Sequence, residues 1–194
     1  PEQEQSFAPA ICNRLDRNTA GLVLAAKDAA TLRELNRLIR ENRIQKTYLC
    51  VLTATPPKQT DILHAYHWKD AKTNTVTISD HPKAGYREII TEYRVLQQQN
   101  GLCLAEITLH TGRTHQIRAH MAHIHAPLAG DSKYGDRRKN ESLHLKHQLL
   151  CAYQLQFHPE ADSCLAYLNG KTVTAPLPDF VSRFFPTFSS KNRK

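Results

Sequence analysis

One aspartate stands between two arginines near the start of the chain, in residues 13–27 (NRLDRNTAGLVLAAK). The apolar run that follows, residues 22–26, is typical of a buried strand, so Asp16 is predicted to lie in a loop that a strand supports. A carboxylate in such a loop can act as a nucleophile or as a general base without a cofactor. An isolated Asp-Arg neighbour is more often a surface ion pair, so Asp16 becomes a catalytic candidate only together with other residues.

A second polar cluster occupies residues 111–124 (TGRTHQIRAHMAHI). The spacing of Ile117, Met121 and Ile124 predicts a helix that begins near Arg113 and turns these three side chains into the core. The polar side chains would then share the helix start with unpaired backbone amides, a place that favours phosphate groups.

The elements around these two clusters are of mixed type. Asp28 is a predicted N-cap for a helix whose apolar residues recur up to Asn42, and a last short helix is expected over residues 180–185. In residues 47–53 the alternation places Tyr48, Cys50 and Leu52 on one face and Leu49 and Val51 on the other. Further strands are predicted at residues 62–68, 75–78, 88–96, 102–109, 149–157 and 164–168. Consecutive strands indicate hairpins, a largely antiparallel mixed sheet flanked by helices and loops, and an α+β fold.

Composition narrows the class of protein. The 194 residues fit one domain, and a net charge of +8 with a pI near 9.4 favours a polyanionic partner. No apolar run approaches the roughly 18–20 residues of a membrane span, and no signal peptide opens the chain, so we expect a cytoplasmic protein without a membrane partner. The five cysteines form no CxxC pair, which favours reduced thiols.

The segments Arg14-Leu15-Asp16 and Gln116-Ile117-Arg118, in this order and about a hundred residues apart, resemble the RluA-type family of RNA pseudouridine synthases. The resemblance extends from about residue 11 to about residue 178. The family usually has His at the position of Asn13, and it generally shows Leu-His-Ala where this chain has Leu-Cys-Ala at residues 150–152.

The resemblance implies that the chain converts specific uridines to pseudouridine in RNA, without an organic cofactor or metal. Asp16 would be the catalytic carboxylate, and Arg118 would hold it in its charged form. Tyr48, in the family's Lys-x-Tyr strand, would stack on the uracil, and its hydroxyl is a candidate to take the C5 proton. Whether Asp16 attacks the sugar, adds to the base or removes a ribose proton is left open.

The resemblance also implies a set of RNA contacts. Arg14 is expected to fill the space that the extruded nucleotide leaves, because a guanidinium can stack and also reach phosphate. We expect Leu150 to line the uracil pocket. Arg113, His115 and Gln116 are expected to contact the RNA backbone at the helix start. A basic extension of this track, or an ordinary solvated loop, is expected at Lys133, Arg137, Arg138 and Lys139.

Two rival functions come from other classes. Five histidines between residues 110 and 125 could indicate a metal hydrolase, but there is no HExxH, and Glu106 and Asp131 do not fall at a familiar ligand spacing. The other rival is a noncatalytic RNA-binding module, which would have no need of Asp16, Tyr48 and Arg118 together. We therefore expect a synthase, with ribosomal RNA favoured over transfer RNA as its partner.

The resemblance implies strands and a glycine-containing loop upstream of the Arg-Leu-Asp segment, yet only fifteen residues precede Asp16. We therefore expect residues 1–188 to be a catalytic domain without its N-terminal segment, followed by a basic tail at 189–194, and a monomer.

Overall fold

Residues 60–79 and residues 87–109 each form an antiparallel β-hairpin in the computed structural model, which describes residues 7–189. Except for Ser189, the predicted basic tail at 189–194 lies outside the described residues. The strands of the large sheet are β2 (Ala20–Gly21), β4 (Ile44–Leu52), β5 (Thr60–Asp70), β6 (Thr75–Ser79), β7 (Arg87–Gln99), β8 (Leu102–Leu109), β9 (Leu150–Phe157) and β10 (Thr172–Thr174).

This large sheet has the order β10-β9-β4-β8-β7-β5-β6, and every neighbouring pair along that path is antiparallel. One parallel pair is added where β2 lies beside β9. A second sheet joins β1 (Ala10–Ile11) to β3 (Ala25–Ala26). The predicted α+β class with a largely antiparallel mixed sheet is therefore confirmed.

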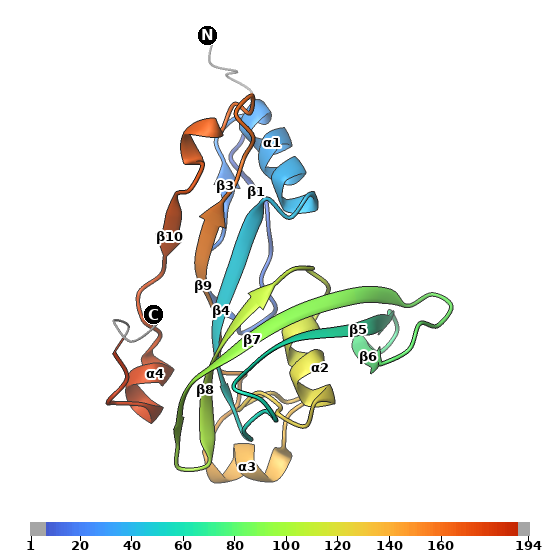
Figure 1. Ribbon diagram of the computed structural model, residues 1–194, viewed down its shortest axis with the longest axis vertical. Helices are drawn as coiled ribbons and strands as arrows, with labels where there is room; N and C mark the ends of the chain where they lie inside the picture. Colours follow the sequence, from blue (N-terminus) through green and yellow to red (C-terminus); the bar gives the residue numbers. More distant parts are fainter. Residues whose placement is uncertain (1–6, 190–194) are drawn as a thin grey trace.

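The helices cover opposite parts of this elongated body. The helix α1 (Ala29–Arg40) lies with β1 and β3 at one end, and α3 (Arg137–Ser142) lies at the other (Figure 1). The helix α2 (Gln116–His123) lies against β6 and β7, and α4 (Asp179–Phe184) lies close to the C-terminus. In the described part of the chain the longest helix, α1, has 12 residues, and none is long and apolar enough to cross a membrane.

The two predicted ends of α1 are confirmed. The Asp28 carboxylate accepts a hydrogen bond of 2.7 Å from the Thr31 amide and so satisfies one of the free N–H groups of the first turn. Asn42 follows the last turn with a φ of 55°, the left-handed conformation that ends many helices.

The core has two sides because β4 is buried on both faces. Cys50 and Leu52 pack with Ile117 and Met121 of α2 on one side, with Tyr48 partly buried against them. Leu49 and Val51 pack on the other side, in a cluster that includes Val181 and Phe185. The predicted facing of β4 is thus confirmed, and it turns Tyr48 toward α2.

The strand predicted at residues 22–26 is wrong as a single element. The chain forms β2 and β3 instead, and these two short strands belong to different sheets. Gly21 has a φ of 115°, and its Cα lies so close to β9 that an added Cβ would be 2.2 Å from the Ala152 carbonyl oxygen. The backbone therefore pairs with β9 at Gly21 and then turns away to meet β1.

Two further predictions are corrected. Residues 164–168, predicted as a strand, contain the 3₁₀ turn Ala166–Leu168, because Leu165 and Leu168 pack three residues apart on the α1 cluster. Residues 137–139, predicted as a loop, begin α3, whose first turn is capped by the Asp136 carboxylate accepting from the Lys139 amide. The strands β1 and β10 were not predicted from the sequence, and they are only two and three residues long.

Candidate active site

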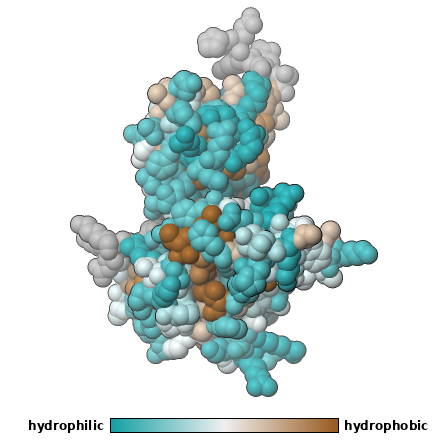
Figure 2. All heavy atoms as spheres, turned by 45° about the vertical axis from the view of Figure 1, so that its right-hand side comes forward, coloured by the Kyte–Doolittle hydropathy of each residue, from teal (hydrophilic) through white to brown (hydrophobic). Residues whose placement is uncertain are grey.

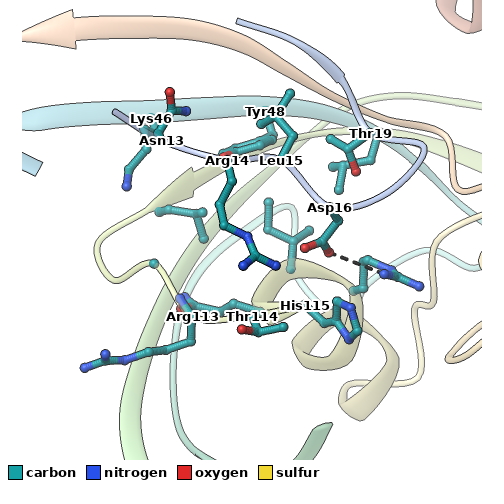
Figure 3. Close-up of a pocket in the computed structure, with 16 residues that line it drawn as sticks. Asn13, Arg14, Leu15, Asp16, Thr19, Lys46, Tyr48, Arg113, Thr114 and His115 are labelled. Carbon is teal, nitrogen blue, oxygen red and sulfur yellow. Dashed lines mark hydrogen bonds and ion pairs between the residues drawn. The ribbon is translucent and has the colours of Figure 1, made fainter. Parts of the chain in front are cut away.

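A pocket of about 210 Å³ opens between the loop that carries Asp16, the strands β4, β8 and β9, and the start of α2 (Figure 3). This is smaller than the roughly 300–1,000 Å³ of sites for drug-sized ligands, so it suits a group of the size of one base or sugar. Every residue for which the sequence predicts a catalytic or substrate-binding role lines it: Arg14, Asp16, Tyr48, Arg113, His115, Gln116, Arg118 and Leu150.

An ion-pair network of three residues lies at the wall of the pocket. The Arg118 Nη1 donates to Asp16 Oδ2 at 3.3 Å, while its Nε and Nη2 donate to the two carboxylate oxygens of Asp131 at 2.6 and 3.0 Å. The side chains of Arg118 and Asp131 are 7% and 0% exposed, whereas that of Asp16 is 20% exposed. Asp131 therefore fixes the guanidinium from behind, and Asp16 keeps one side open to the pocket.

The charges in this network stabilise one another. Burial alone would lower the pKa of Arg118, but its hydrogen bonds and proximity to Asp131 and Asp16 outweigh burial and raise that pKa. Burial alone would raise the pKa of Asp131, but Arg118 and two backbone amides hold that pKa below its ordinary value. Both groups are therefore charged near neutral pH, and Asp16 faces a permanent cation.

The Asp16 loop is held at both ends. The Asn13 side-chain oxygen accepts from the Leu24 amide at 2.7 Å, and the Thr19 amide donates to the Asp16 carbonyl at 2.9 Å. The buried amide of Gln148 donates to the Arg17 carbonyl at 2.6 Å and to the Thr19 hydroxyl at 3.2 Å. These bonds fix the backbone on each side of Asp16, which is the condition for a preorganised carboxylate.

Tyr48 enters the pocket where β4 departs from regular pairing with β9. The register of that pair shifts between Thr47 and Tyr48. Burial, and then the charge of Asp16, raise the pKa of Tyr48 to about 12, so the phenol keeps its proton near neutral pH. Lys46, two residues earlier on β4, also lines the pocket, and burial lowers its pKa. No role of Lys46 was predicted from the sequence.

Gln116 is placed as a support of the loop rather than as a free contact for RNA. It is 2% exposed, its amide nitrogen donates to the Ile90 carbonyl and the Thr91 hydroxyl, and its oxygen accepts from Thr111 and the Arg113 amide. With its donors and acceptor used inside the protein, the side chain shapes residues 111–116. Its donors and acceptor already have partners within the protein, and its contact with the RNA backbone stays a prediction.

His115 is likewise largely enclosed. It caps α2 in the left-handed conformation with a φ of 52°, and its ring is joined to the Tyr134 hydroxyl by a hydrogen bond of 2.9 Å. The same hydroxyl accepts from the Val76 amide at 2.9 Å. Burial lowers the pKa of His115, which favours the neutral ring. The guanidinium of Arg118 also lies over the Tyr134 ring, 5.4 Å from its centroid.

Two arginines remain exposed at the mouth of the pocket. Figure 3 shows Arg14 directed into the space between the Asp16 loop and residues 113–114, while Arg113 extends away from Asp16. Within residues 7–189 neither guanidinium has an ion-pair partner. Both are therefore available to an anionic ligand, as a phosphate track requires.

The predicted basic extension is largely engaged within the protein. Lys133 donates to the Asn74 carbonyl at 2.7 Å, and Lys139 donates to the Thr53 carbonyl. Arg137 pairs with Glu141 on α3. These side chains thus serve the local structure, and their part in a phosphate track stays a prediction.

The histidines of residues 110–125 are dispersed. His110 bonds Glu92, His120 bonds the buried Thr91 hydroxyl, and His123 bonds Asp80. Among the residues that the structure describes, no group of three or more His, Cys, Asp or Glu side chains is arranged to hold a metal ion.

The assembled site combines four chemical functions. It offers a positioned carboxylate, a buried cation that stabilises the negative charge, an aromatic ring with a protonated hydroxyl, and apolar surface from residues such as Leu150. Exposed cations at the mouth add affinity for phosphate. Such a site suits chemistry at one nucleotide of a polyanionic chain.

Comparisons with known proteins point to one family. Residues 1–123 match the family described as RNA pseudouridylate synthase. An uncharacterized RNA pseudouridine synthase of Chloroflexus aurantiacus is 35% identical over 88% of this chain and 50% of its own length. Ribosomal large subunit pseudouridine synthase C of Buchnera aphidicola is 33% identical over 88% of this chain and 53% of its own.

The solved structures agree on the fold. Human RNA Pseudouridylate Synthase Domain Containing 1 has a TM-score of 0.73 and 23% identity over 90% of this chain and 71% of that chain. At that identity the likeness concerns the fold alone. The present chain spans about half the length of the curated relatives that it matches.

Proposed function

Because this chain belongs to the RNA pseudouridylate synthase family, we propose that it isomerises uridine to pseudouridine within an RNA chain. The reaction breaks the bond between the ribose C1′ and N1 of uracil, turns the base, and forms a bond between C1′ and C5. The proton on C5 is lost and N1 gains one, so the product has the same composition as the substrate. No oxidant, reductant or co-substrate is needed.

The observation that carries this proposal is the pair of Asp16 and Arg118 in the wall of the pocket. An ionised carboxylate can attack the sugar, add to the base or remove a ribose proton, and each of these steps needs a charged, aimed oxygen. The Arg118 guanidinium lies 3.3 Å from Asp16 as a positive counter-charge, and Asp131 keeps Arg118 in place. A pocket that only bound RNA would gain nothing from a carboxylate next to cations that bind phosphate.

Tyr48 would act on the base. Its ring lies in the pocket with Asp16 and Leu150, where it can stack on uracil. Because the pKa of Tyr48 is about 12, its hydroxyl carries a proton near neutral pH. It would accept the C5 proton, directly or through water, only while it gives up its own proton to another acceptor. The tyrosine therefore works as a relay and not as a stored phenolate.

The RNA must present its uridine outside a helix, because a stacked base cannot enter a pocket of this size. Arg14, aimed between the two loops, would take the vacated place in the stack. Arg113 would bind backbone phosphate from the rim. The Gln116 amide and the His115 ring would mainly position this rim and would make few contacts with the RNA.

Ribosomal RNA is the proposed substrate in preference to transfer RNA, since several relatives are named ribosomal large subunit pseudouridine synthases. A cytoplasmic location and a monomeric state accompany this proposal, the first because ribosomal RNA is cytoplasmic in bacteria such as the sources of these relatives.

The test is to incubate the protein with unmodified large-subunit ribosomal RNA and, in parallel, with unmodified transfer RNA, and to measure pseudouridine by mass spectrometry. Pseudouridine at one or a few ribosomal positions is expected. Mapping the same positions in cells that lack the gene would name the target. Tight RNA binding without any pseudouridine in either RNA would instead favour a noncatalytic RNA-binding module.

A further inference from the structure

An exposed aromatic surface lies outside the pocket, where β5 ends and β7 begins. The rings of Trp68 and Tyr86 stack with centroids 6.3 Å apart and planes inclined by 22°, and the Lys83 ammonium lies 5.6 Å from the Tyr86 centroid. Trp68 is 41% exposed, and it is the one tryptophan of the chain. We call these three residues, Trp68, Tyr86 and Lys83, the aromatic platform.

The sequence builds the platform locally. Trp68 and Tyr86 stand one position beyond the pairing of His67 with Arg87, so they share a face of the β5–β7 ladder. Gly85, with a φ of 79°, allows the turn before β7 to close, and the Tyr86 amide donates to the Lys83 carbonyl at 3.0 Å. An added Cβ on Gly85 would touch Trp68 at 3.9 Å. The turn thus packs against the edge of the Trp68 ring.

The hairpin that carries the platform is joined to the wall of the pocket. His67, next to Trp68, makes a hydrogen bond of 2.9 Å with the carbonyl of Thr114, a residue that lines the pocket. On β6, the Val76 amide donates to the Tyr134 hydroxyl, which in turn contacts His115. The β5–β6 hairpin and the start of β7 extend from this junction to one side of the molecule (Figure 1). Because adjacent side chains of a strand point to opposite faces, Trp68 lies on the face of the ladder away from His67 and α2.

The charges around the platform suit a polyanion. Lys83 has no carboxylate within ion-pair distance among residues 7–189. The nearby carboxylates have other partners: Glu88 lies 3.8 Å from His64, Asp80 bonds His123, and Asp70 accepts the amides of Lys72 and Thr73 in the hairpin turn. Lys83 is the charged group that the structure places against these rings.

We propose that the aromatic platform binds a single-stranded nucleotide of the substrate RNA outside the pocket, with its base stacked on Trp68 and its phosphate near Lys83. This inference rests on the proposed function, since it concerns the same RNA. Exposed aromatic side chains beside cations are the usual means by which proteins hold single-stranded RNA, because every base offers a π-face.

A protein partner would fit this surface less well. Protein-binding hot spots surround their aromatic residues with a desolvated apolar rim. The face of the molecule drawn in Figure 2 is mostly hydrophilic, with one apolar strip. The overall charge of +8 also favours nucleic acid.

Because Trp68 is the one tryptophan, its fluorescence reports stacking without a label. The protein is titrated with single-stranded oligouridylate, and Trp68 emission and the anisotropy of end-labelled RNA are followed together. Emission should be quenched with the same midpoint as the anisotropy change. Uridine monophosphate, which can fill the pocket alone, should quench far less.

Substitutions test whether the contact between RNA and the platform contributes to RNA affinity. Trp68→Ala should weaken oligouridylate binding by about fivefold or more, because one stacked base contributes at least that much. Trp68→Phe should keep most of the affinity, and Lys83→Glu should lose affinity while leaving both rings in place. Tyr167→Ala is the matched control, since Tyr167 is 70% exposed on another part of the chain and its loss should leave affinity unchanged.

Three outcomes would overturn the proposal: anisotropy that shows binding while Trp68 emission stays constant, a folded Trp68→Ala protein with wild-type affinity, or equal losses for Trp68→Ala and Tyr167→Ala. Failure of the proposed function would be seen differently: RNA would bind and quench Trp68 emission but would never be converted to pseudouridine.

Discussion

The ion pair between Arg118 and Asp131 allows a prediction with a calculable size. Asp131→Asn keeps the shape of the side chain and removes its charge. The amide oxygen can still accept from the backbone amides of Lys133 and Tyr134, as Asp131 Oδ1 does now. The new NH₂ group, however, would face the Arg118 Nε at the place where the Asp131 Oδ2 accepts at 2.6 Å.

The expected loss of stability follows from burial. Asp131 is 0% exposed and Arg118 is 7% exposed, so the variant leaves a buried guanidinium with Asp16 as its one carboxylate, at 3.3 Å. Removing one partner of a buried pair costs about 3–5 kcal/mol. For a protein of this size that corresponds to a fall in Tm of roughly 6–20 °C.

The assay is thermal unfolding followed by circular dichroism, together with kcat and RNA affinity measured well below the lowered Tm. Turnover should fall while RNA affinity stays close to that of the wild type, because Asp131 acts through Arg118 and not on the RNA. Asp28→Asn is the control, since Asn caps a helix as well as Asp does. A Tm of Asp131→Asn within about 2 °C of the wild type, a shift that corresponds to about 1 kcal/mol or less, would refute the role given to this pair.

Three other predictions concern separate parts of the site. Arg113→Ala should lower the log-log slope of RNA affinity against salt by about one, and an unchanged slope would remove Arg113 from the phosphate track. Tyr48→Phe keeps the ring and removes the hydroxyl, so it should bind RNA normally but release tritium slowly from 5-tritiated uridine; release at the wild-type rate would exclude the hydroxyl. His120 is buried and has a pKa of about 4, held down by desolvation and then by His123. Because the folded pKa lies below the ordinary 6.5, the protein should lose stability as the pH falls from about 6.5 to about 4. Over that range His120→Gln should lose about 3 kcal/mol less unfolding free energy than the wild type, as measured by urea unfolding. Equal losses in the two proteins would contradict the assignment.

Local patterns predicted the parts of the fold that depend on local packing. The alternation in β4 follows from burial on two faces, and the spacing of Ile117 and Met121 follows from one buried side of α2. The interruption at Gly21 was not predictable in this way. It depends on contact with Ala152, more than a hundred residues away, and no feature of residues 20–26 alone indicates which sheet each residue joins.

The same limit applies to the site. Asp16, Tyr48 and Arg118 were found because the motifs that carry them resemble a family, whereas Asp131 and Gln148 act through long-range contacts. Asp131 was weighed only as a metal ligand, and its spacing from Arg118 has no helical or strand period. A signal was available in principle, since a buried Arg must have an acidic partner and Asp131 follows an apolar run, Ala126 to Ala129, interrupted by Pro127.

Asp16→Asn tests the central claim most directly. Arg118 keeps its closer pair with Asp131 in this variant, so the loss of stability should be smaller than that of Asp131→Asn. It should fold and bind RNA, since Arg14 and Arg113 are untouched, yet mass spectrometry should detect no pseudouridine in ribosomal RNA that the wild type and Asp28→Asn modify. Substantial pseudouridine formation by Asp16→Asn, prepared free of wild-type enzyme, would contradict a mechanism that depends on the Asp16 carboxylate.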